Sequence, residues 1–188
     1  MAIKIERCKI PDLMIITSEI HVDSRGYFME TYKRSDFYNA GIIVEFLQDN
    51  ISLSKKGTTR GLHYQLQPNA QGKLLRAISG KIFEVAVDIR KNSPTFGKWV
   101  GVTLTPESGK QFWIPSGFAA GMTALEDNSI LAYKTTNEYS KPHERGIRWD
   151  DPEIGIVWPS DSFCLIISEK DQQHPLLKDA EINFVYGK

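Results

Sequence analysis

The 188-residue chain has few of the features that mark disulfide-bonded, secreted or membrane proteins. Its two cysteines, Cys8 and Cys164, lie far apart and form no Cys-x-x-Cys or zinc-type spacing, as expected of reduced thiols in a cytosol. Several charges interrupt residues 1–11, which therefore do not resemble a signal peptide, and no run of about 18 apolar residues occurs. We expect a cytoplasmic protein that does not bind a membrane.

An excess of charge of either sign is also missing. Lys plus Arg and Asp plus Glu each number 23, so no overall field favours nucleic acid or an anionic surface. Any site for an anionic ligand must be local. The length predicts a single domain, residues 1–188, with enough chain to bury a sizeable core.

Histidine, the commonest metal ligand, is scarce and scattered. No two of the four histidines stand at His-x-His or His-x3-His spacing, which argues against a metal centre of the kind that clusters imidazoles on neighbouring strands. We expect no metal ligands and no cofactor. The histidines are His21, His63, His143 and His174.

Strand patterns dominate the chain. Phe83, Val85 and Val87 alternate with Glu84 and other residues, which predicts a strand with one buried face. Further short strand-like runs occupy residues 13–16, 44–47, 74–78, 99–104, 111–114, 129–133 and 163–167, separated by Gly and Pro turns. Only two short helices are expected, at 36–40 after a Ser35 cap and near 176–180. The pattern predicts an all-β fold and leaves sandwich, jelly roll and up-and-down barrel open.

The run Arg60-Gly61-Leu62-His63-Tyr64-Gln65, followed by Gln71-Gly72-Lys73, carries the strongest chemical information. An imidazole accepts a proton near pH 7, and a nearby ammonium stabilises the oxyanion formed when a proton leaves carbon next to a carbonyl. This pairing suits enolate chemistry without a cofactor. The alternative is structural: His63 as a hydrogen-bonded polar residue and Lys73 as a solvated side chain.

Motifs along the chain identify a family. They are Asp23-Ser24-Arg25-Gly26-Tyr27-Phe28-Met29-Glu30, Gln48-Asp49-Asn50, Arg60 to Gln65, Ala70-Gln71-Gly72-Lys73, Val85-Ala86-Val87-Asp88-Ile89-Arg90, Trp113-Ile114-Pro115, Gly117-Phe118-Ala119, Tyr133-Lys134, Tyr139, Gly146-Ile147 and Glu169-Lys170-Asp171. Together they resemble the dTDP-4-dehydrorhamnose 3,5-epimerases from about residue 10 to about residue 175. The resemblance implies a metal-free, cupin-like jelly roll with a few short helices, and a homodimer that exchanges N-terminal strands.

The resemblance also implies the reaction and its catalytic residues. The family epimerises C3 and C5 of dTDP-4-dehydro-6-deoxy-D-glucose to give dTDP-4-dehydro-L-rhamnose. By this likeness His63 is the general base and Asp171 its partner. Lys73 faces the C4 oxygen, and Tyr133 donates the proton on the other face of the sugar. On residue type alone, Tyr133 is more often a strand aromatic that fills a β core.

Nucleotide recognition must work without a phosphate-binding loop, because neither Gly-x-Gly-x-x-Gly after a strand nor a Walker A sequence occurs. By the same resemblance, basic side chains bind the diphosphate or the sugar, and amide and carboxylate side chains make further polar contacts. The thymine ring is expected to stack on Tyr139. We expect the stretch from Arg25 through Phe28 to Glu30 to reach each site from the partner subunit. The other expected contacts are Gln48, Asp49, Asn50, Arg60, Glu144 and Lys170.

One position departs from the family pattern. After Gly117-Phe118-Ala119 the family usually has a histidine that contacts the sugar, whereas this chain has Ala120. A methyl group removes a donor and an acceptor and opens space. Three hypotheses follow: the 3,5-epimerase, a single-site epimerase or keto-isomerase on a related dTDP-4-keto sugar, and a silent sugar-nucleotide binding module.

Overall fold

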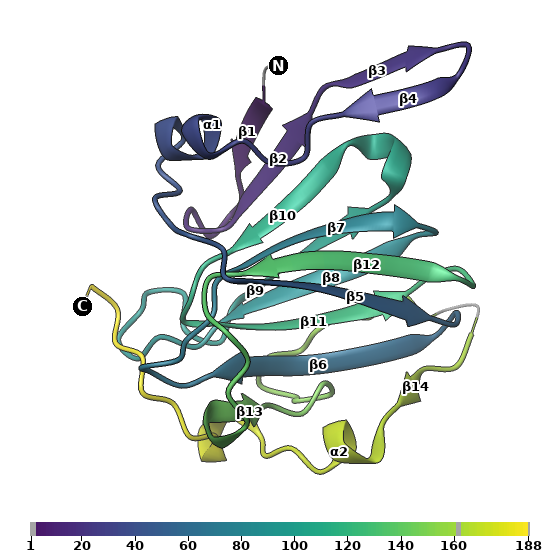
Figure 1. The fold of residues 1–188 in the computed structure, drawn as a ribbon. Coiled ribbons are helices and arrows are strands. Elements are labelled where there is room, and N and C mark those ends of the chain that lie inside the picture. The colour runs from purple at the N-terminus through teal and green to yellow at the C-terminus, as the bar shows by residue number, and fades with distance from the viewer. Residues whose placement is uncertain (1–2, 161–162, 188) are drawn as a thin grey trace.

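The computed structural model describes residues 3–160 and 163–187, and most of its regular structure is β-strand in two facing sheets (Figure 1). The first sheet has the order β1 (Ile3–Arg7), β2 (Met14–Ser18), β10 (Lys110–Ile114), β7 (Lys73–Ser79), β12 (Ser129–Thr135) and β5 (Gln48–Ser54). The second has β13 (Glu144–Gly146), β6 (Thr58–Gln65), β11 (Phe118–Ala124), β8 (Ile82–Asp88) and β9 (Trp99–Leu104), with β14 (Ile166–Ile167) beside β6. The sequence-based expectation of a jelly roll is confirmed.

The main core lies between the two sheets. Phe112 and Leu75 of the first sheet pack in one cluster with Leu104 and Ala120 of the second, and Phe112 and Leu104 are fully buried. Burial of each large apolar side chain contributes about 1.5 to 3 kcal/mol. This cluster fixes the distance between the sheets, and with it the distance between any side chains that face each other across them.

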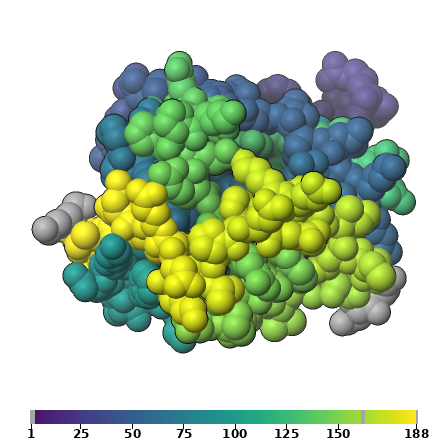
Figure 2. Space-filling view, turned by 90° about the horizontal axis from the view of Figure 1, so that it is seen from below, coloured from purple at the N-terminus to yellow at the C-terminus, as the bar shows by residue number. Residues whose placement is uncertain are grey.

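A second cluster covers the outer face of the second sheet. Val85 and Val87 of β8 pack there against Trp158 and Phe184, which belong to the C-terminal part of the chain. In Figure 2 this C-terminal part, green to yellow, spreads over the face of the molecule seen from below. The prediction of one buried face for β8 is therefore wrong: both faces are buried, and Glu84 is 2% exposed.

The outer face of the first sheet is covered differently. Phe37 of α1 (Arg34–Asn39) packs near Leu74 and Trp113, and the remaining outer face carries exposed apolar side chains, including Ile51 and Leu53. The hairpin of β3 (Ile20–Asp23) and β4 (Gly26–Met29) projects beyond this face as a separate two-stranded sheet (Figure 1).

Several local predictions need correction. Residues 44–47 form no strand, because Val44 and Phe46 pack as an irregular segment against the α1 cluster, and β5 begins only at Gln48. In the C-terminal part the strand is limited to Ile166–Ile167. Helix α1 begins one residue before Ser35, with Lys33 at its N-cap position and no side-chain cap.

The expected C-terminal turn exists as the 3₁₀ helix η3 (Leu177–Asp179). Two other 3₁₀ turns are η1 (Pro106–Ser108) and η2 (Lys141–His143). The short helix α2 (Glu169–Gln172) was not expected. Within the described residues, no helix is both long and apolar enough to cross a membrane.

Candidate active site

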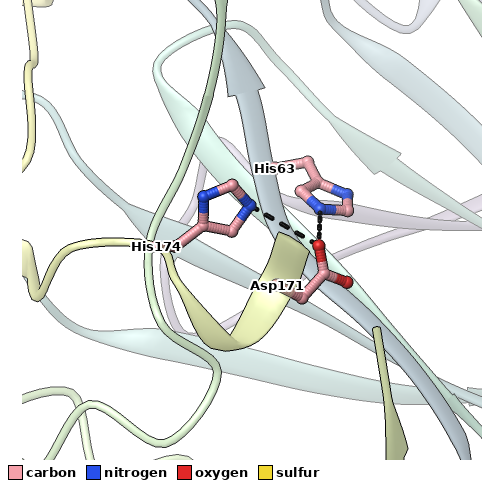
Figure 3. A group of neighbouring side chains, drawn as sticks. All are labelled: His63, Asp171 and His174. Carbon is pink, nitrogen blue, oxygen red and sulfur yellow. Dashed lines mark hydrogen bonds and ion pairs between the residues drawn. The ribbon is translucent and has the colours of Figure 1, made fainter. Parts of the chain in front are cut away.

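His63 and Asp171 form a close pair although they come from distant parts of the chain. His63 lies on β6, and Asp171 lies on α2, which packs beside that strand (Figure 3). The distance between His63 Nε2 and Asp171 Oδ1 is 2.7 Å. The Ser168 hydroxyl accepts a hydrogen bond from the Asp171 N–H at 3.1 Å and so caps the first turn of α2. The cap fixes the carboxylate opposite the imidazole.

Gly61 connects Asp171 to β6 and allows β6 to lie close to β11. Its backbone N–H donates to Asp171 Oδ2 at 3.2 Å. Its φ is +120°, and a Cβ there would lie 2.6 Å from Gly121 Cα and 2.8 Å from Ala120 O on β11. Any other residue would push the strands apart. The glycine in the Arg60 to Gln65 run is thus part of the geometry that holds the pair.

The electrostatics of the pair determine which nitrogen acts as the base. Burial by itself disfavours ionisation of Asp171, but hydrogen bonds from His63 and Gly61 outweigh it and hold the pKa of Asp171 below its usual value. An ionised carboxylate requires a proton on His63 Nε2, which leaves Nδ1 with the free lone pair. That nitrogen points away from Asp171 (Figure 3).

The opposite sheet supplies Lys73 on β7 and Tyr133 on β12. Lys73 Nζ reaches across to the backbone carbonyl of His63 at 3.4 Å. Burial lowers the pKa of Lys73, and the nearby carboxyl groups of Glu84 and Glu144 act against that shift. Burial also raises the pKa of Tyr133, so its phenol holds its proton at neutral pH. The base and the phenol therefore belong to different walls of the fold.

Two adjoining cavities lie between the sheets. One of about 530 Å³ is lined by Arg60, Ala120, Lys170 and Asp171, and the other, of about 350 Å³, by Gln48, Asn50, Tyr139 and Glu144. Three residues line both cavities: His63, Lys73 and Tyr133. The candidate catalytic side chains thus stand where the two spaces meet.

The polar side chains of the smaller cavity are mutually ordered. Gln48 donates to Asn50 Oδ1 at 2.7 Å and accepts from the Tyr139 N–H at 2.8 Å. Glu144 Oε2 accepts from the Tyr139 hydroxyl at 3.0 Å and from Lys170 Nζ at 2.6 Å. These contacts connect five of the sequence-predicted binding residues into one network at the cavity mouth.

Four other predicted contacts lie elsewhere in this chain. Asp49 is on the opposite face of β5 from Gln48 and Asn50, and its carboxylate pairs with Lys134 Nζ at 2.9 Å. A strand alternates its side chains, so a run of three neighbours cannot all face the cavity. The remaining three, Arg25, Phe28 and Glu30, lie on or just after the projecting hairpin and do not line either cavity.

Two residues near the catalytic groups were not predicted from the sequence. His174 Nε2 lies 3.5 Å from Asp171 Oδ1, and its ring stands edge-on to His63 with centroids 5.6 Å apart. It occupies the space that a Cβ on Gly146 would need. Glu84 lines the larger cavity, although the strand pattern gave no reason to single it out. The only sequence hint for His174 is its position three residues after Asp171.

His63, Asp171 and His174 also place three potential metal-ligating atoms within 4.8 Å of one another. A cation there would have to displace the proton that His63 and Asp171 share in their short hydrogen bond. The donor set therefore fits a proton-transfer pair better than a metal centre.

Comparison with known proteins identifies the relatives of this chain. The family model for dTDP-4-dehydrorhamnose 3,5-epimerase matches residues 7–179. A dTDP-4-dehydrorhamnose 3,5-epimerase from Shigella flexneri is 52% identical over 178 residues, which cover 94% of this chain and 92% of the relative.

Solved structures give the same result. The epimerase from Legionella pneumophila in complex with dTDP-4-keto-L-rhamnose is 44% identical, with a TM-score of 0.91 and 94% coverage of both chains. A 3'-monoepimerase from Streptomyces bikiniensis in complex with dTDP-quinovose is 29% identical, with a TM-score of 0.87 and coverage of 92% of this chain and 87% of the other. On this evidence the chain belongs to the dTDP-4-dehydrorhamnose 3,5-epimerase family.

Proposed function

We propose that the protein epimerises dTDP-4-dehydro-6-deoxy-D-glucose at C3 and C5 to dTDP-4-dehydro-L-rhamnose, without a cofactor. One observation supports this most directly: His63 with its Asp171 partner and Tyr133 come from facing sheets and line the same cavity, with Lys73 beside them. Inversion at carbon needs a base on one face and a proton donor on the other.

In the proposed reaction, His63 Nδ1 takes the proton from C3 or C5, and the C–H electron pair moves toward the C4 oxygen as an enolate. The ammonium of Lys73 stabilises that oxyanion. The phenol of Tyr133 then donates a proton to the opposite face of the same carbon. Solvent exchange returns a proton to Tyr133 and removes one from His63, so the enzyme is restored and no electrons are gained or lost.

The smaller cavity suits the nucleotide. We assign thymine stacking to Tyr139, whose ring is about half exposed at the mouth. Gln48, Asn50 and Glu144 then supply polar contacts, while Arg60 and Lys170 meet the diphosphate or the sugar. In this arrangement the hexose occupies the larger cavity beside Ala120.

We propose further that residues 1–188 form one domain and that two copies complete each other's sites through their hairpins. The hairpin supports this because Val22, Tyr27 and Phe28 are 78%, 56% and 61% exposed, unusual for apolar side chains. Docking on a second copy would cover them and bring in Arg25 and Glu30.

Light scattering of Phe28→Asp tests the assembly. A dimer for the unchanged protein and a monomer for the variant are expected, and a wild-type monomer would contradict the proposal.

A cytoplasmic location is consistent with two free cysteines, Cys8 and Cys164.

Ala120 favours a second candidate function, single-site epimerisation. It leaves a methyl group in the larger cavity, where the family usually has a histidine, and a 3'-monoepimerase is among the structural relatives. Loss of that contact would change how the sugar presents C3 and C5 to His63.

Proton NMR in deuterated buffer separates these functions. With dTDP-4-dehydro-6-deoxyglucose, we expect loss of the C3 and C5 proton signals with the unchanged enzyme and no loss with His63→Ala. Exchange at one carbon alone would establish the single-site enzyme. Exchange at neither would refute the epimerase proposal.

A further inference from the structure

Glu84 is a buried acid with one carboxyl oxygen that lacks a hydrogen-bond partner among the described residues. It is 2% exposed, and its Oε2 has no hydrogen-bond partner among the described residues. Burial of a polar group without a partner costs about 1 to 3 kcal/mol. The same side chain lines the cavity that also holds His63 and Lys73. A group that destabilises the fold and faces the active cavity is a candidate for contact with the substrate.

Strand register places Glu84 on the inner face of the second sheet, which forms one wall of that cavity. Glu84 lies opposite Met122 on β11, and the neighbouring pair on the same face is Ala86 with Ala120. Ala120 in turn lies opposite His63 on β6. Strand β11 thus lies between the acid and the base, and its Ala120 and Met122 line the cavity.

The surroundings of Glu84 favour the neutral form of its carboxyl group. Burial raises the pKa of its carboxyl well above the usual value, although the positive charge of Lys73 opposes the shift. A neutral carboxylic acid has one O–H donor, as well as acceptor oxygens. A carboxylate at this position would instead offset the charge of Lys73, which the enolate needs.

We propose that Glu84 is a further substrate-contacting residue, a neutral carboxylic acid that donates a hydrogen bond to an oxygen of the 4-keto hexose in the space left by Ala120. This rests on the proposed function, since it assumes that the larger cavity holds the hexose. Glu84 then supplies, from β8, a polar contact to the sugar in a region where β11 offers only methyl and thioether groups.

Two variants test the contact. Glu84→Met keeps the approximate volume without the polar atoms, and Glu84→Gln keeps a neutral donor and acceptor. We expect Glu84→Met to lower kcat/KM for the keto sugar by roughly tenfold to a hundredfold, the effect of one lost buried hydrogen bond, and Glu84→Gln to recover most of that loss. Affinity for dTDP, which lacks the hexose, should be the same in all three proteins.

Stability distinguishes this role from a structural one. Replacing an unpartnered buried acid by an apolar side chain should leave the melting temperature equal or higher. The matched control is Asp88→Asn on the same strand. Asp88 is buried but hydrogen-bonded to Arg90, Ser93 and Thr95, so that variant should melt earlier without changing the ratio of kcat/KM to dTDP affinity.

The outcomes separate the two proposals. If the unchanged enzyme exchanges protons at C3 or C5 and Glu84→Met retains full kcat/KM, the contact is refuted and the epimerase stands. If Glu84→Gln is as impaired as Glu84→Met, the neutral-donor role is wrong. Infrared difference spectra of wild type against Glu84→Gln provide a test independent of activity: a carboxylic-acid carbonyl band at neutral pH supports the proposal, and a carboxylate band overturns it.

Discussion

Two buried carboxyl groups line the same cavity in contrasting environments. Asp171, at the base end, receives hydrogen bonds from His63 and Gly61, and its pKa is lowered. Glu84, on β8, has an Oε2 without a hydrogen-bond partner among the described residues, and the pKa of its carboxyl group is raised. Residue type is nearly the same, so the difference comes from the donors that each environment supplies.

Because of this difference, we expect Asp171 and Glu84 to play different roles in the reaction. A carboxylate with its donors in place orients an imidazole and favours the imidazolium that forms during proton transfer. A neutral acid donates a hydrogen bond without cancelling the cation that stabilises the enolate.

The largest effect is expected from Asp171→Asn. The amide offers its NH₂ as well as its oxygen, so the imidazole can take the wrong tautomer, and kcat should fall by about 10³- to 10⁴-fold. KM for the keto sugar should change little, because Asp171 orients the base. Steady-state kinetics and NMR exchange at C3 and C5 measure both. A large rise in KM with kcat unchanged would show that Asp171 binds substrate instead.

Lys73→Met comes next. Removal of the ammonium takes away the preorganised charge at the proposed C4 oxygen, and we expect kcat to fall by about 10²- to 10³-fold. Lys134→Met is the matched control, since Lys134 lies on the outer face of the same sheet and pairs with Asp49. The control should retain the kcat of the unchanged enzyme. Equal losses in the two variants would contradict a specific role for Lys73.

The all-β class, most strands and the family could be predicted from the sequence because period-two patterns and ordered motifs are local features. The pairing of His63 with Asp171 came from the resemblance alone, since no pattern shows that a four-residue helix would carry Asp171 to β6. That helix has one buried residue and one cap, too little for a periodic signal.

Burial on both faces of β8 escaped prediction for a different reason. The outer face of β8 is covered by Trp158 and Phe184, which are distant from β8 in sequence. An alternating pattern contains no information about such distant partners. Glu84 therefore read as solvent-facing, and Asp49 read as equivalent to its neighbours Gln48 and Asn50. Tertiary packing decided the environment of both.

His174→Leu should have a moderate effect. The imidazole packs on Gly146, and its Nε2 lies 3.5 Å from Asp171 Oδ1 without a hydrogen-bond partner among the described residues, so we expect its removal to loosen Asp171 and lower kcat only about fivefold, or about 1 kcal/mol in the barrier. Its role is to position Asp171. Thermal melting with intact binding of dTDP serves as the control for folding.

The pH profile distinguishes positioning from simple packing. Burial and the charge of His63 lower the pKa of His174, with Lys170 acting in the same sense and Asp171 and Glu144 opposing. At acid pH a protonated His174 would compete for Asp171, so the acid limb of kcat/KM should be steeper in the unchanged enzyme than in His174→Leu. Parallel limbs would leave only a packing role.

The smallest effect concerns stability against pH, where the two carboxyl groups should act in opposite directions. The folded-state pKa of Asp171 is lowered from 3.8, so its contribution is present above that pH and is lost as the pH falls through the folded value. The folded-state pKa of Glu84 is raised well above 4.5, so its contribution is largest below 4.5 and declines as the pH rises toward the folded value.

Urea unfolding of the unchanged protein and of Glu84→Gln across about pH 5 to 8 measures the second slope. Glutamine does not titrate, so the stability advantage of the variant should grow with pH, by at most about 1.4 kcal/mol per pH unit. Asp88→Asn is the comparison: the pKa of Asp88 is also lowered from 3.8, and its carboxylate is hydrogen-bonded to Arg90, Ser93 and Thr95, which do not titrate between pH 5 and 8, so the difference of this variant from the unchanged protein should be constant over the same range. A constant difference for Glu84→Gln as well would mean that Glu84 is already ionised in the fold, and the contrast between the two ends of the cavity would disappear.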